Sequence, residues 1–193
     1  MIDAIDETVR ALIRSRLDDA YADVTITFDT PDESFPSAAV ELPAVNLFLF
    51  DIHENHLLRE STPRVTREGE TWHRKYPPVR VDCHYLATAW TGEDDTAGEH
   101  RLLGAVMKAL LRWRYVPAEL IDEALPEQPM AVRAFALQSE SLGASSDFWR
   151  ALGSKPRASL RFTITVAVEA FPATEVPPPP ESVVARIGER SGA

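Results

Sequence analysis

The sequence predicts an α+β fold, a single domain with a mixed or antiparallel sheet of about five strands flanked by two main helices. Five segments carry the alternating or continuous apolar residues typical of strands. Two other segments place apolar residues at helical spacing. The chain has 193 residues, 45% of them hydrophobic, which is enough for one core, and it contains no internal repeat.

The two main helices are predicted over residues 2 to 18 and 96 to 113. The apolar positions of the first are Ile2, Ile5, Val9, Leu12, Ile13 and Leu17. The buried stripe of the second is predicted to be Leu102, Leu103, Val106, Met107, Leu110 and Leu111. We expect Thr96 and Glu99 to form a capping box and Pro117 to stop this helix. A shorter helical segment is expected in "SSDFWRAL", residues 145 to 152.

Strands are predicted at residues 24 to 28, 44 to 52, 79 to 90, 130 to 138 and 159 to 171. The segment 44 to 52 is apolar at both parities, so we expect it to be central in the sheet. The last segment alternates between apolar and polar residues, which predicts a half-buried strand near an edge. The polar stretch from Asp51 to Arg67 is expected to leave the sheet, and Gly69 to turn a hairpin.

Composition limits the classes of partner. The net charge of −10 argues against nucleic acid and suits docking on a basic protein surface, or simply solubility. Cys83 is the only cysteine, which excludes an intrachain disulfide and a cysteine-rich zinc knuckle. With no signal-peptide pattern and no run of ~18 apolar residues, we expect a cytoplasmic chain that does not insert directly into a membrane.

No segment predicts a catalytic, cofactor-binding or metal site. His53 and His56 lie three residues apart beside Asp51 and Glu54, but at a strand exit this spacing puts the two rings on opposite sides. Cys83 and His84 are neighbours on a strand and therefore point to opposite faces, so we expect Cys83 to be a core residue. No phosphate-binding glycine motif and no GxSxG is present.

Three segments in order resemble one protein family. "PAVNLFLFDIHENHLLR" resembles its strand and polar exit, "YPPVRVDCHYLATAW" its Pro-Pro strand, and "EHRLLGAVMKAL" its central helix. The residues that carry the resemblance are Asn46, Asn55, Leu58, Arg59, Pro77, Pro78, His84, Tyr85, Leu86, Glu99, His100, Leu102, Leu103, Gly104 and Met107. The family is the cap, or tube-terminator, protein of contractile injection systems, phage-tail-like particles of the antifeeding-prophage and virulence-cassette type.

The resemblance covers residues 1 to 171 and implies a terminator fold like that of phage tails. It implies a structural cap without enzymatic activity, a six-fold ring that ends the inner tube and sheath, with those proteins and itself as partners. The site candidates it implies are Asn46, Asn55, Arg59, Pro77, Pro78, His84 and Tyr85. Either they tie down their own loops or they contact a neighbouring subunit. The alternatives are a small-molecule enzyme using His53, Glu54, His56 or His84, and a generic adaptor or chaperone.

Residues 172 to 193 are predicted to be a proline-rich linker and a short tail. The four prolines from Pro177 to Pro180 favour a stiff, extended spacer. Beyond them, Val183, Val184 and Ile187 fall on one side of a helical spacing. We expect this stripe either to dock on a neighbouring subunit or the last sheath layer, or to fold back on its own domain.

Overall fold

The computed structural model describes residues 1–137 and 146–178. The chain forms two compact units. The core unit comprises Met1–Arg59 and Val79–Val168. The hairpin unit comprises Glu60–Pro78 and the chain from Glu169 onward, described to residue 178.

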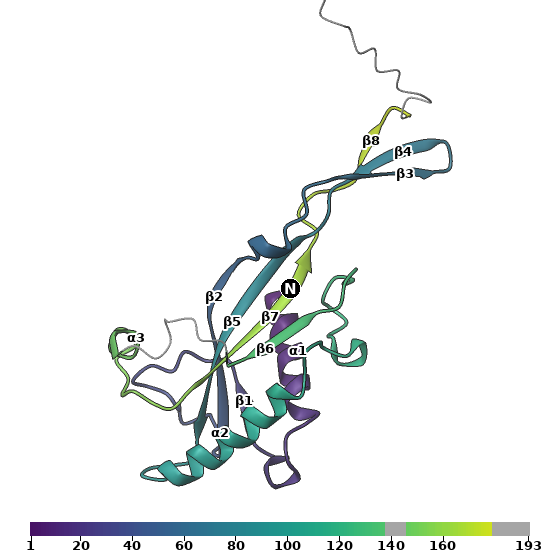
Figure 1. Cartoon of the computed structure of the whole chain (residues 1–193). Helices are drawn as coiled ribbons and strands as arrows, with labels where there is room; N and C mark the ends of the chain where they lie inside the picture. The colour runs from purple at the N-terminus through teal and green to yellow at the C-terminus, as the bar shows by residue number, and fades with distance from the viewer. Residues whose placement is uncertain (138–145, 179–193) are drawn as a thin grey trace, which may run out of the picture. The chain divides into compact units, whose positions relative to one another are not determined.

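The core unit is built on a mixed five-stranded sheet in the order β1-β2-β5-β7-β6 (Figure 1). Its strands are β1 (Thr25–Thr27), β2 (Ala44–Glu54), β5 (Val79–Trp90), β6 (Arg133–Ala136) and β7 (Leu160–Val168). β1 pairs parallel to β2, and all other neighbours pair antiparallel. The predicted α+β fold with a sheet of about five strands is therefore confirmed.

Two helices cover one face of this sheet. α1 (Ile2–Arg14) and α2 (Thr96–Leu111) share one apolar cluster with the inward side chains of β2, β5, β6 and β7. Cluster members from each helix include Val9, Leu12, Leu102 and Val106. A third helix, α3 (Ser146–Ala151), and the 3₁₀ turns η1 (Asp19–Tyr21), η2 (His56–Leu58) and η3 (Ala118–Leu120) complete the unit.

The helix ends differ from prediction. α1 ends at Arg14, whose guanidinium donates to the Ala22 carbonyl in the following turn. The prediction of a capping box at Thr96 is wrong, because the N-cap of α2 is Asp95. The Asp95 carboxylate accepts a hydrogen bond from the Gly98 amide at 2.9 Å. Leu111, predicted to be buried, is 52% exposed in the last turn of α2.

One prediction about strand burial and one about a strand end are also wrong. β7 lies near an edge as expected, one strand in from the short edge strand β6. It is not the half-buried strand that was predicted, because Thr163 and Thr165 are buried rather than facing solvent. β2 does not end at Ile52 but continues to Glu54, paired with β5, so Asp51 to Glu54 stay in the sheet.

The hairpin unit holds a three-stranded sheet in the order β3-β4-β8 (Figure 1). β3 (Arg64–Glu68) and β4 (Thr71–Lys75) form the predicted hairpin. Gly69 takes the left-handed conformation (φ 64°) that the turn requires and that favours glycine. β8 (Thr174–Val176) was not predicted, since its residues fall within the expected linker; it pairs with β4. The domain boundary after residue 171 stays a prediction.

The helices within the described ranges are all too short or too polar to cross a lipid bilayer. The tail candidates Val183, Val184 and Ile187 lie outside the described residues.

Candidate functional site

The two faces of β5 have different chemistry. Cys83 and Tyr85 belong to the apolar cluster under the helices, whereas Asp82 and His84 pair with β2 and β7 residues on the other face. Burial raises the pKa of the Cys83 thiol to about 11. Cys83 is thus the predicted core residue, and its protonated thiol lies on the opposite face from His84.

A polar network lies on the second face and is centred on Asp82, which is only 9% exposed. Its Oδ1 accepts from the Thr165 hydroxyl at 2.6 Å, and its Oδ2 accepts from the Asn55 side-chain amide at 2.9 Å. The Asn55 oxygen in turn accepts from the Leu58 amide at 3.1 Å and caps η2. The network therefore anchors the chain after β2 to the middle of the sheet.

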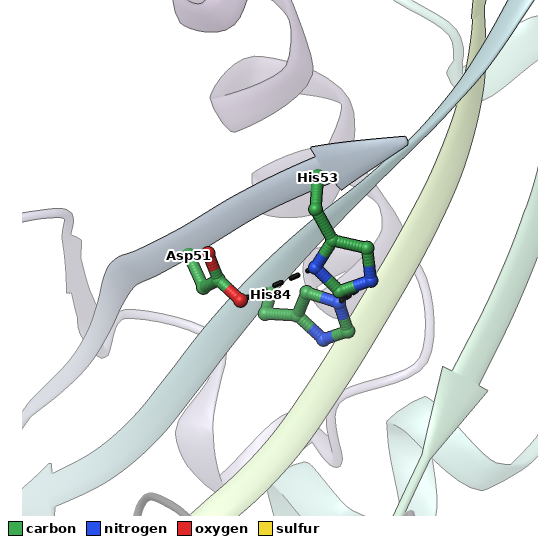
Figure 2. A group of neighbouring side chains, drawn as sticks. All are labelled: Asp51, His53 and His84. Carbon is green, nitrogen blue, oxygen red and sulfur yellow. Dashed lines mark hydrogen bonds and ion pairs between the residues drawn. The ribbon is translucent and has the colours of Figure 1, made fainter. Parts of the chain in front are cut away.

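Beside this network, Asp51, His53 and His84 form a cluster (Figure 2). Asp51 and His53 come from β2 and His84 from the neighbouring β5. The His53 Nδ1 lies 3.2 Å from the Asp51 Oδ2, and the two imidazoles stack with ring centroids 4.6 Å apart. One ligand atom from each residue lies within 4.8 Å of the others.

A β-bulge creates this cluster. Leu49 pairs with Tyr85 and Asp51 with His84, so Phe50 is an extra residue in β2. The bulge reverses the parity of β2, which brings Asp51 and His53 onto the face that carries His84. Residue spacing suggested His56 as the neighbour of His53 and not His84, because neither the bulge nor the register can be read from the sequence.

The side chains of the candidates Asn46 and Tyr85 form hydrogen bonds within the chain. Asn46 is fully buried; it accepts from the Thr27 hydroxyl and donates to the Asp29 carbonyl, each at 2.9 Å. The Tyr85 hydroxyl donates to Asp6 at 2.7 Å. Burial is the main cause that raises the pKa of both Asp6 and Tyr85.

The remaining candidates lie nearer the surface. Arg59 is exposed and pairs with Glu54 through two of its nitrogens, with Nε 2.6 Å from Oε1. The Arg59 hydrogen bonds lower the pKa of the Glu54 carboxyl and raise that of Arg59. Pro77 and Pro78 are half-buried directly before β5, as predicted. A role of any candidate in subunit contacts stays a prediction.

The polar candidates of the core unit have structural partners within the chain. The candidate amides and the Asp82 carboxylate are engaged in hydrogen bonds that join β1, β2, β5, β7 and the loops between them.

The chain belongs to the Pvc16 N-terminal domain family, whose model matches residues 4–182. Two solved structures share its fold. One is a sheath/tube terminator of an extracellular contractile injection system, PVC, in the extended state, with a TM-score of 0.69 and 24% identity over 99% of this chain. The other is the tube-terminating cap of the anti-feeding prophage, with a TM-score of 0.66 and 24% identity over 97% of this chain.

The present chain spans 64% and 61% of the length of those two proteins. A comparison with curated proteins gives no match. The resemblance seen in the sequence is thus confirmed at the level of family and fold.

Proposed function

We propose that the chain is a structural cap that ends the inner tube and sheath of a contractile injection system, as a six-fold ring. The observation that carries this proposal is the family match over residues 4–182, together with a fold shared over nearly the whole chain with two terminators. The protein is proposed to have no enzymatic activity. Its partners would be further copies of itself and the tube and sheath proteins.

The proposed mechanism is geometric. A closed ring needs a heterologous interface, with a different patch on each side of the subunit. One end of the ring must match the last tube and sheath layer, and the other must offer no site for a further layer. Internal hydrogen bonds of Asn46, Asn55 and Asp82 support this role because they hold the strands and loops of the core unit in one geometry.

The hairpin unit supplies a surface suited to such contacts. Its described residues, 60–78 and 169–178, include no buried side chain. β3 and β8 are the edges of its sheet, and an edge strand offers unpaired backbone groups to another chain. We propose that this unit gains much of its stability from a neighbouring subunit or the sheath.

The decisive experiment images particles made with and without the chain. Six-fold density at the distal end in its presence, and tubes or sheaths of uncontrolled length in its absence, are the expected results. Five-fold density, or no density at the distal end, would refute the ring. Isolated protein is a poor test, because a ring that forms only on the tube end is monomeric in solution.

Synthesis in the cytoplasm, incorporation into particles and release on lysis are part of the proposal. Fractionation checks this: the chain should sediment with particles from the lysate, and a chain found only in the membrane fraction would contradict it.

The tail is proposed to dock Val183, Val184 and Ile187 on a neighbouring subunit or the last sheath layer. Truncation after Phe171 would also remove β8, so a chain ending at Pro178 is the sharper variant. It should keep the melting temperature of the full chain and be retained less firmly on particles. Equal retention, or loss of the fold, would contradict the docking of the tail.

A further inference from the structure

The imidazoles of His53 and His84 already have the spacing of two ligands on one metal ion. Their Nε2 atoms lie 3.4 Å apart. In a tetrahedral zinc site, two imidazole nitrogens at ~2.0–2.1 Å from the ion are about 3.3 Å apart. The two side chains come from paired strands, so the backbone hydrogen bonds of the sheet hold their origins in place.

The Nδ1 atom of each ring has a polar neighbour, and the two Nε2 atoms contact each other, where an ion would replace that contact. An ionised carboxylate can only accept, so Asp51 fixes the hydrogen of His53 on Nδ1 and the lone pair on Nε2. The His84 Nδ1 lies 2.9 Å from the Thr163 hydroxyl, which can accept in the same way. Such outer hydrogen bonds are the usual support of metal-binding histidines.

The charge around the pair suits a cation. Besides Asp51, the Asp82 Oδ2 lies 4.0 Å from the His53 Nε2. Asp82 is held in place by Thr165 and Asn55, so its negative charge stays beside the site. Imidazole ligands suit zinc, copper and nickel ions, whereas magnesium and calcium prefer oxygen.

We propose that His53 and His84 bind one divalent transition-metal ion of the zinc class through their Nε2 atoms. Asp51 orients His53, and water completes the coordination. The ring planes differ by only 25°, so the rings must tilt to aim both lone pairs at one point. The half-exposed side chain of His53 has room for this rotation. The bound ion then cross-links β2 and β5 just beyond the bulge.

The test is calorimetric titration of Zn²⁺ into the untagged full-length chain, followed by the same titration of variants. The wild-type chain should bind one ion at this site. His53→Ala and His84→Gln should each lower the affinity at least tenfold, and Asp51→Asn by roughly 10–100-fold, as for other outer-shell partners. Zn²⁺ should also raise the melting temperature of the wild-type chain, because it binds the folded state.

Matched controls are His56→Ala and His73→Ala, which remove histidines outside the cluster and should leave the affinity unchanged. Circular dichroism of the metal-free variants checks folding; if His84→Gln fails to fold, the exposed His53→Ala decides alone. No Zn²⁺ binding by the wild-type chain, or equal binding by His53→Ala, overturns the proposal. Loss of binding on His56→Ala overturns it too, because the ion would then sit elsewhere.

Discussion

The two sheets of this protein have the same backbone hydrogen bonding and very different surroundings. In the core unit, β5 is flanked by β2 and β7, and most of its side chains are buried on one face or the other. In the hairpin unit, every residue of β3 is exposed, and β4 and β8 hold no buried residue. Strand pairing is common to both sheets, but among residues 1–137 and 146–178 only the first sheet has a hydrophobic core.

The hairpin unit is held by surface contacts instead. Lys75 pairs with Glu169 at 2.6 Å, and the guanidinium of Arg67 lies 5.9 Å from the ring centre of Trp72. Exposed contacts of these kinds contribute about 1 kcal/mol or less each. A small sheet without an apolar face is marginally stable in water. The core unit therefore contributes most of the stability of the isolated chain.

Hydrogen exchange should show the largest contrast. Opening the core sheet requires global unfolding, which costs roughly 5–15 kcal/mol in a typical domain, whereas a coreless hairpin opens locally. In the isolated chain, the paired amides of β3 and β4 should exchange at least ~1000-fold faster than those of β5 and β7. Similar protection in the two sheets would mean that the hairpin unit has a stabilising partner within the chain.

Truncation of a buried ring should separate the units by equilibrium unfolding. Phe162→Ala in β7, where the side chain is 1% exposed, should lower the free energy of unfolding by about 3–5 kcal/mol, because it leaves a cavity. Val65→Ala in β3, where the side chain is 47% exposed, should change it by less than about 0.5 kcal/mol. Urea titrations measure both free energies of unfolding. A large loss of stability in Val65→Ala would show that the hairpin unit also contributes to the stability of the isolated chain.

The polar side of the core unit can be tested at Asn46. Asn46→Ala leaves the Thr27 hydroxyl and the Asp29 carbonyl without this partner and should cost about 1–3 kcal/mol of unfolding free energy. Thr66→Ala, an exposed polar change in β3, is the control and should be nearly neutral. If Asn46→Ala is also neutral in the isolated chain, the side chain is not needed to hold β1 on β2.

The smallest effect is expected at the α2 N-cap. Asp95→Ala should lower the melting temperature by ~2–4 °C, since it removes the acceptor of the Gly98 amide, and Thr96→Ala should not. That hydrogen bond lowers the pKa of Asp95 below its ordinary 3.8. The extra stability of the wild-type chain over Asp95→Ala is fully present above pH 3.8 and is lost as the pH falls through the pKa of Asp95 in the folded state. Thermal scans at several pH values check both expectations.

Much of the fold could be predicted because helical and strand periodicity are local properties of the chain. The segments around α2, β2, β5 and β7 were identified from apolar spacing alone. The Gly69 turn followed from the single residue type that tolerates its backbone conformation. The family resemblance likewise rested on short segments, and it extends to the whole fold.

Local sequence patterns were enough to predict the main helices and most of the strands, the core position of Cys83 and the absence of a nucleotide-binding glycine motif. Three features are visible only in the tertiary structure: β6 pairs with β7, Asp95 caps α2, and β8 pairs with the hairpin strand β4. The bulge at Phe50, which brings His53 to His84 across 31 residues of sequence, is also visible only there. These outcomes depend on long-range pairing and register, which a one-residue shift reverses and which no local pattern records.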